Sequence, residues 1–190
     1  MSYTRLTCIT LLCAFPWLLL ACGSMTIKDT TTEAYIPIQG WILELHQNIV
    51  IPSGRTRVFF QEGRLLYAVN EYKPHCQLIV RNISQQPQDV HADRFTIDRV
   101  FGTIDEIVSN ERILLAAAGD AAVVDGGGGG GERNLIYFYH MALHASKQPD
   151  VTYLVCGGAS EEPFLARYPT IQDIYSSLGK YATLILPGED

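Results

Sequence analysis

The sequence predicts a mainly β protein, an antiparallel sandwich or distorted barrel with one short C-terminal helix. From Ile36 onward, short runs of β-branched and aromatic residues alternate with turn signals rich in Gly, Pro, Asn and Asp. About eight such runs occur, and one segment near the C-terminus has the period of an amphipathic helix. Because nearly all the elements are strands that follow one another directly, an antiparallel sheet is favoured over an α/β fold.

Residues 1–21 have the pattern of a signal peptide. No charged side chain occurs between Arg5 and Cys22, and the apolar run 6–20 is interrupted by Pro16. As a helix this run would extend about 22 Å, which is short of the roughly 30 Å hydrocarbon core of a bilayer. The basic start, the apolar middle and the small residues around Cys22 are instead typical of an export signal.

The motif Leu19-Leu20-Ala21-Cys22 resembles the lipobox of bacterial lipoproteins. In that family the cysteine thiol receives a diacylglyceryl group, a dedicated peptidase cuts before the cysteine, and the new amino terminus is usually acylated. The resemblance implies lipidation of Cys22 and a place in the bacterial cell envelope. Gly23, rather than Asp, follows the cysteine, and the sorting rule of enterobacteria then implies the outer membrane, facing the periplasm. The alternative is an ordinary secretory signal in which Cys22 is incidental.

The charge of the remaining chain excludes one class of partner. Without residues 1–21 the chain keeps 169 residues with 13 basic and 20 acidic side chains, a net charge of −7. An acidic chain without a basic cluster is a poor candidate for binding nucleic acid. The same charge gives no attraction to an anionic membrane, so we expect attachment to depend on the lipid.

The first half of the mature chain is predicted to be a tether followed by strands. Residues 22–35 are polar and lack an apolar period, which predicts a flexible tether before one β-rich domain over residues 36–190. The runs 42–51 and 56–60 flank Pro52-Ser53-Gly54 and predict a hairpin. Further strands are predicted at 64–69, 76–82 and 95–100, whereas residues 104–118 are ambiguous between strand and helix.

The second half contains a glycine run, a hairpin and the helix. Gly126–Gly131 lies in a predicted disordered loop at about 119–133, because six glycines have high backbone entropy and no side chain to pack. A phosphate-binding loop is not expected, because the Lys and the Ser or Thr of that motif are absent. Segments 135–145 and 151–156 predict a long hairpin. Thr170 is then a predicted helix N-cap with Asp173 as its capping-box partner. The helix is expected to end at Gly179, and a last strand follows at 181–186.

Two cysteines remain for a disulfide if the chain is exported. Cys8 and Cys13 would leave with the signal peptide and Cys22 would carry lipid, so Cys76 and Cys156 are the only pair in an oxidising compartment. We therefore predict a Cys76–Cys156 bridge. The alternatives are two buried thiols that never meet, or a metal site formed with His75.

His140 and His144 are the candidates for a metal site. On a helix their spacing would place both rings on one face, as in zinc proteases, but the Glu that those enzymes carry after the first His is absent. The aromatic run before His140 favours a strand, on which both rings share a half-exposed face. No serine-hydrolase elbow occurs, and paired carboxylates lie in loop-like contexts. We therefore expect no enzyme activity and no cofactor.

Tyrosines in the last third of the chain form a second candidate surface, because tyrosine suits protein interfaces as well as ordinary strands. They are Tyr137, Tyr139, Tyr153, Tyr168, Tyr175 and Tyr181. The chain from about Ile36 also resembles small envelope lipoproteins of proteobacteria, a likeness carried by the segments 51–59, 72–76 and 148–156.

The sequence therefore predicts a lipid-anchored envelope lipoprotein that acts as a structural or protein-interaction module. Its expected partners are the membrane, through the lipid, and a further envelope protein. The alternative is a lipoprotein that binds a small ligand or a metal through His140, His144 and His75.

Overall fold

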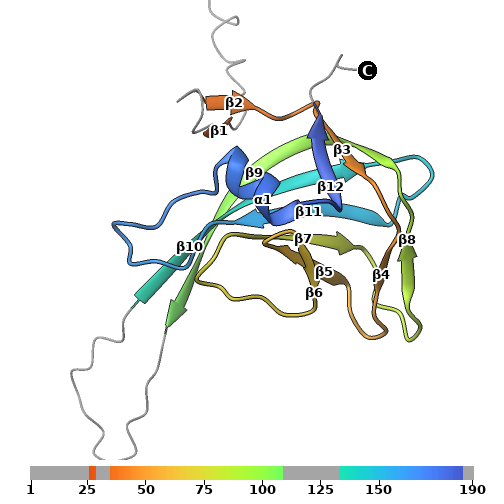
Figure 1. Cartoon of the computed structure of the whole chain (residues 1–190), viewed down its shortest axis with the longest axis horizontal. Helices are drawn as coiled ribbons and strands as arrows, with labels where there is room; N and C mark the ends of the chain where they lie inside the picture. The colour runs from red at the N-terminus through yellow and green to blue at the C-terminus, as the bar shows by residue number, and fades with distance from the viewer. Residues whose placement is uncertain (1–25, 29–34, 109–132, 186–190) are drawn as a thin grey trace, which may run out of the picture.

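The computed structural model describes residues 26–28, 35–108 and 133–185, and all structural statements concern these ranges (Figure 1). Their main feature is one eight-stranded antiparallel sheet with the strand order β12-β3-β9-β10-β11-β7-β5-β6. Its strands are β3 (Ile42–Leu45), β5 (Arg57–Gln61), β6 (Arg64–Leu66), β7 (His75–Val80), β9 (Arg94–Val108), β10 (Arg133–His144), β11 (Val151–Gly157) and β12 (Ala182–Ile185). The predicted mainly β fold is confirmed.

Two small sheets accompany the main one. The strands β1 (Thr26–Lys28) and β2 (Tyr35–Pro37) pair with each other, as do β4 (Ile49–Ile51) and β8 (Gln88–Val90). A single α-helix, α1 (Ile171–Leu178), occurs in the described part of the chain. None of the described helical structure has the length and apolar character of a membrane-crossing helix.

The main sheet is curled, and the helix lies on its concave face. α1 contacts β12 at one end of the strand order and β5 and β7 near the other end. A flat sheet could not bring these strands to one short helix, so the face under α1 is the inner face of a half-barrel. This inner face holds the main core, whose fully buried members include Phe60, Phe95, Leu43, Met141, Leu154 and Ile174.

The predicted ends of the helix are confirmed. Thr170 is the N-cap, its Oγ1 accepts a hydrogen bond from the Asp173 amide at 3.2 Å, and the Asp173 carboxylate accepts from the Thr170 amide at 2.8 Å. This reciprocal pair satisfies two amides that the first turn would leave unbonded. Gly179 follows with φ 54°, and a Cβ there would stand 2.4 Å from the Cα of Gly63. Glycine at 179 therefore lets the helix end lie directly on the β5–β6 turn.

The disulfide predicted from cysteine usage is present. Cys76 on β7 and Cys156 on β11 are directly opposite each other, with a Cα–Cα distance of 4.0 Å and an S–S bond of 2.05 Å. Both are fully buried in the main core. The bridge therefore joins two neighbouring strands that are 80 residues apart in sequence.

The hairpin predicted for segments 42–51 and 56–60 is wrong. Segment 42–51 forms two strands, β3 and β4, that belong to different sheets. The chain turns at the exposed residues 46–48, where the His46 amide donates to Tyr181 O at 2.9 Å. β4 then pairs with β8, while β5 pairs with β6 and β7. Apolar residues lie on both sides of the polar stretch His46-Gln47-Asn48. They made the segment resemble one long strand, because β3 and β4 both bury side chains.

The other long hairpin is confirmed, and one strand is longer than expected. β10 pairs with β11 in antiparallel register, as predicted for segments 135–145 and 151–156. β9 continues to Val108, so residues 104–108 of the ambiguous segment are strand. The pairing of β9 with β10 runs from Arg133 opposite Val108 to His144 opposite Thr96, with one irregularity between Ala142 and Leu143.

Four residues of the predicted tether, 22–35, lie in strands: Thr26–Lys28 form β1 and Tyr35 begins β2. β1 lies inside segment 22–35, and Ile27 is fully buried in the main core. Tyr139 also donates its hydroxyl to Thr26 O at 3.0 Å. Ile27 lies between the polar residues Thr26 and Lys28. A single apolar residue makes no periodic pattern, so the sequence did not predict this strand. Cys22 and the glycine run lie outside the described residues.

Candidate functional site: an aromatic cluster on the outer face

The outer, convex face of β9, β10 and β11 carries the candidate site. In antiparallel pairs, directly opposite residues point to the same face. His140 is opposite Phe101 on β9 and Val155 on β11. Two residues farther along β10, Ala142 is opposite Arg99 on β9 and Tyr153 on β11. These side chains therefore share the outer face, while the residues between them on each strand point into the core.

Four of these side chains form a packed group, which we call the outer aromatic cluster: Arg99, Phe101, His140 and Tyr153. The rings of Phe101 and His140 stack at 4.7 Å with an interplanar angle of 8°. Tyr153 meets Phe101 edge to face at 6.3 Å, and the Arg99 guanidinium carbon lies 5.4 Å from the centre of the Phe101 ring. The three rings are half-buried and Arg99 is exposed. The cluster thus offers π-surface and one cation to solvent.

His140 is held as part of this stack. Its Nε2 lies 2.9 Å from Thr103 Oγ1, and partial burial lowers the pKa of its imidazole below the ordinary value. His144 is exposed at the end of β10, opposite Thr96. Both therefore lie on the outer face, as the strand interpretation predicted. Within the described ranges, no group of three or more His, Cys, Asp or Glu side chains could hold a metal ion.

A buried histidine lies farther along the same face. His75 is 4% exposed and packs edge to face against Phe59 at 6.5 Å and Phe138 at 5.8 Å. Its Nδ1 lies 3.2 Å from Lys73 O, and burial lowers the pKa of its ring. The sulfur of Cys156 is bonded to Cys76, so His75 has no cysteine thiol to activate there.

A hollow of about 360 Å³ borders the cluster. It shares Tyr153 with the cluster and is also lined by Arg81 and His144. Its other lining residues are four apolar ones and one threonine: Ala142, Leu143, Ala145, Pro149 and Thr152. Arg81 donates to Pro149 O at 3.4 Å across this region. The hollow therefore extends the aromatic cluster toward the β10–β11 turn, as one continuous uneven surface.

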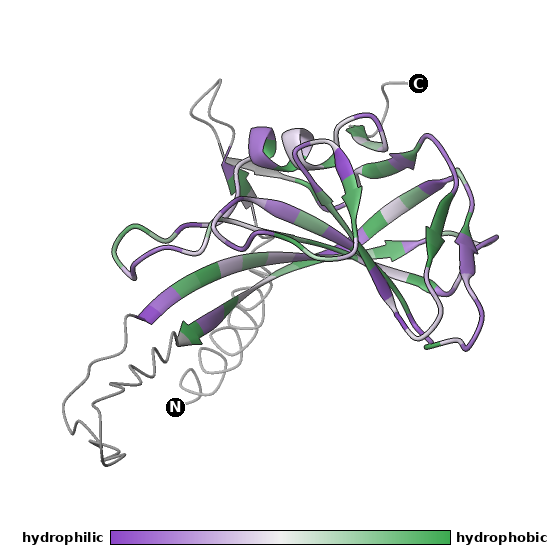
Figure 2. Ribbon diagram, turned by 60° about the horizontal axis from the view of Figure 1, so that its bottom comes forward, coloured by the Kyte–Doolittle hydropathy of each residue, from purple (hydrophilic) through white to green (hydrophobic). Residues whose placement is uncertain are grey.

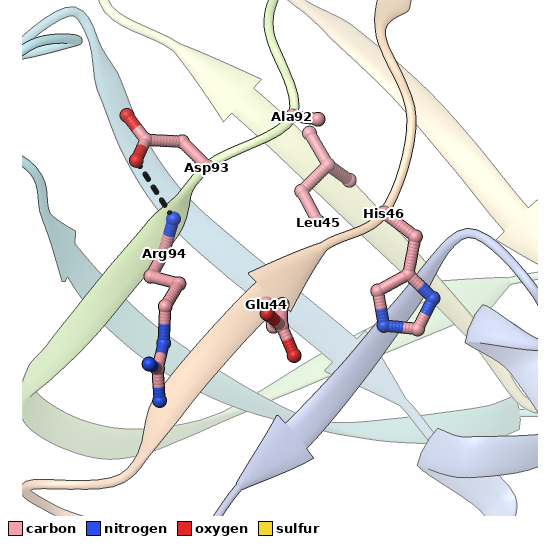
Figure 3. A pocket seen from close by; sticks show the side chains of 6 residues that line it. All are labelled: Glu44, Leu45, His46, Ala92, Asp93 and Arg94. Atoms are coloured by element: carbon pink, nitrogen blue, oxygen red, sulfur yellow. Dashed lines mark hydrogen bonds between the residues drawn. The ribbon is translucent and has the colours of Figure 1, made fainter. Parts of the chain in front are cut away.

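A second hollow, of about 290 Å³, lies where the end of β3 meets the start of β9 (Figure 3). Its charged and ionisable walls are Glu44, His46, Asp93 and Arg94. The hydrogen bond from Gln148 lowers the pKa of Asp93, and the Arg94 amide adds to this effect. The carboxylates of Glu44 and Asp93 point in different directions (Figure 3). They do not converge on one point, as paired-carboxylate catalysis would need.

The tyrosines predicted to form one surface are divided between several places. Tyr153 is on the outer face, whereas Tyr139 stacks on Tyr168 at 4.4 Å and Tyr137 meets the same ring edge-on at 5.0 Å. Burial raises the pKa of the Tyr168 hydroxyl. Tyr181 packs against Phe60, and Tyr175 donates to Leu184 O at 3.0 Å. These side chains therefore do not make one interface.

Arg99, Phe101 and Thr103 were not predicted as partners of His140. The strand was expected to end at residue 100, whereas β9 continues to Val108. The neighbours of a histidine on another strand also depend on register, which no local pattern reveals. No family model, curated protein or solved structure matches the chain. The cluster offers a partly exposed surface of aromatic rings and one exposed arginine, side chains that are suited to binding a partner.

Proposed function

We propose that this chain is a non-enzymatic lipoprotein, anchored in the outer membrane and facing the periplasm, that acts as a structural or protein-interaction module. The observation that carries the proposal is the Leu19-Leu20-Ala21-Cys22 motif after a short apolar run. The Cys22 sulfur would form a thioether with a diacylglyceryl group transferred from a phospholipid. In that step the thiol loses its proton and the phosphate-bearing headgroup leaves.

The outer aromatic cluster supports the interaction role. Aromatic residues and arginine are enriched at the centres of protein interfaces, where they give large contact areas at a small cost in conformational entropy. Arg99 stacked on Phe101 combines both residue types in one preformed arrangement. The disulfide also supports an oxidising compartment, because such bonds persist outside the reducing cytosol.

Processing at Cys22 is the first test. Globomycin, which blocks the lipoprotein peptidase, should cause a larger, unprocessed form to accumulate in cells, and mass measurement of the purified protein should show lipid on Cys22. The Cys22→Ser variant provides the control, because it should show no globomycin-dependent form. A native product with an unmodified Cys22, or one that retains Met1, would contradict the proposed anchor.

The interaction role is tested by crosslinking in intact cells followed by mass spectrometry. We expect one envelope protein to be captured reproducibly, and Tyr153→Ala to weaken its binding at least about tenfold, as for a central interface residue. Arg64→Ala, at an exposed site on edge strand β6, is the matched control and should have no effect. Equal capture by both variants would exclude the cluster as the binding surface.

The alternative is a lipoprotein that binds a small ligand or a metal through His140 and His144. The hollow beside His144 favours it. Titration of the protein with Zn²⁺ separates the two functions, because His140→Ala should abolish binding only if the histidines are ligands. No saturable zinc binding by the unaltered protein would exclude the metal form of this alternative.

A further inference from the structure

The loop between β11 and α1 carries an exposed apolar tip, which we call the Phe164–Leu165 tip. Phe164 is 79% exposed and Leu165 is 57% exposed, and Phe164 is the most exposed large apolar side chain in the described ranges. The loop leaves the body on one side of the molecule (Figure 1), and its end is hydrophobic (Figure 2). A single exposed apolar residue is ordinary, but two adjacent ones at a projecting tip are not explained by folding.

Backbone hydrogen bonds and an ion pair hold this loop in place. At its start the Gly158 amide donates to Tyr137 O at 3.1 Å, and Glu161 exchanges backbone hydrogen bonds with Leu135. At its end Arg167 forms an ion pair with Asp173 at 2.8 Å. The turn itself is closed by the Leu165 and Ala166 amides, which both donate to Glu162 O at 2.9 Å. The tip is therefore presented by a fixed loop.

The start of the described chain lies beside the end of this loop. Thr26 O accepts a hydrogen bond from Tyr139, and the Tyr139 ring stacks on Tyr168, four residues after Phe164. Ile27 is fully buried, so β1 is fixed to the body at this point. Cys22 precedes Thr26 by four residues, and such a segment spans at most about 14 Å. A lipid on Cys22 would therefore hold this side of the fold close to the bilayer.

We propose that the Phe164–Leu165 tip inserts into the bilayer beside the Cys22 lipid and fixes the orientation of the β domain; this inference rests on the proposed anchor. Transfer of two large apolar side chains from water into the bilayer lowers the free energy of the system. The lipid tether removes most of the entropic cost of bringing these side chains to the membrane surface. Glu162 at the tip is acidic, and Arg167 is already paired with Asp173. The occupant we infer is therefore a zwitterionic lipid surface, without a preference for anionic headgroups.

The test places a fluorescent probe at the tip. Phe164→Trp is introduced into the native lipidated protein, which is reconstituted into zwitterionic vesicles whose acyl chains carry bromine, a short-range quencher. Ile83→Trp is the matched control, because Ile83 is also exposed, at 63%, but lies in the β7–β8 connection. Trp41 is 4% exposed and supplies the background that is subtracted.

We expect the brominated lipid to quench about half or more of the emission from the tryptophan introduced at position 164 and to leave the control unchanged. Equal emission with and without brominated lipid at both positions would overturn the inference, as would equal quenching at both.

A second arm separates this inference from the proposed anchor. The chain from Cys22 onward, which contains every described strand and helix, is coupled through the Cys22 thiol to a maleimide-bearing phospholipid; Cys76 and Cys156 are bonded to each other and do not compete. If the native protein carries no lipid, the proposed function fails, but this coupled protein still decides the inference. Quenching at position 164 alone supports tip insertion, and its absence refutes it.

Discussion

Removal of the Cys76–Cys156 bridge gives the sharpest test of what holds the sheet together. The double variant Cys76→Ala with Cys156→Ala is compared with the unaltered chain from residue 22, both carrying Cys22→Ser so that no free thiol can exchange. The bridge links residues 80 apart in sequence. On the chain-entropy model, opening such a loop increases the entropy of the unfolded state and lowers the free energy of unfolding by about 4.5 kcal/mol.

Two features of the structure refine that magnitude. The cysteines are directly opposite each other on paired strands, so the fold does not have to change when the bond is absent, and the effect falls mainly on the unfolded chain. Both side chains are also fully buried in the core, so alanine leaves a small cavity that adds to the loss. Reduction of the unaltered protein keeps both sulfur atoms in place and therefore isolates the crosslink from the packing.

Urea unfolding followed by Trp41 fluorescence measures the free energy of unfolding, because Trp41 is buried and is the one tryptophan after residue 21. We expect a loss of about 4 kcal/mol on reduction, which lowers Tm by roughly 8–16 °C for a chain of this size, and a somewhat larger loss in the double variant. A loss below about 1 kcal/mol in both would refute the argument that closing this loop stabilises the fold.

Three single contacts give further expected outcomes. Thr170→Ala removes the capping box of α1 and should lower the free energy of unfolding by about 1 kcal/mol in urea titrations; an unchanged midpoint would show that the cap contributes nothing. Gly158→Ala would place a Cβ 2.3 Å from the backbone carbonyl oxygen of Arg167 and should cost about 1–3 kcal/mol by thermal unfolding, whereas a stable variant would show that the loop can move. Burial lowers the pKa of His75 below 6.5, so the unfolded chain binds more protons just below that pH. The stability from neutral His75 is thus fully present above about pH 6.5 and is lost as the pH falls toward the folded-state pKa. His75→Phe should flatten the decline in urea midpoint over this range, and an unchanged slope would contradict the assignment.

Several elements could be predicted because their signals are local. The alternation in segments 135–145 and 151–156 and the short link between them predicted the antiparallel hairpin of β10 and β11. Thr170 and Asp173 predicted the helix start because a capping box needs only residues three positions apart. The cysteine pair followed from counting, without any geometry. The prediction for segment 42–51 is wrong because apolar residues on either side of His46-Gln47-Asn48 are compatible with one long strand or with two strands in different sheets.

In the candidate site, too, local features could be predicted from the sequence, whereas contacts between strands could not. His140 was identified from the sequence, and its place on a half-buried strand face was expected. Its contacts with Phe101 and Thr103 were not, because they are 39 and 37 residues away and come from the register of β9 against β10. A shift of that register by one residue would turn Phe101 into the core and leave His140 without its stacked partner.

The fold class, the helix with its cap and the two paired cysteines all follow from local signals in the sequence. The sequence also contains the motif from which we infer the anchor at Cys22. Strand order, the place of Ile27 in the core and the meeting of four side chains on one face are visible only in three dimensions; these side chains are Arg99, Phe101, His140 and Tyr153. The reason is physical: turns, caps and side-chain alternation act over a few residues, whereas strand order and register minimise the free energy of the whole sheet.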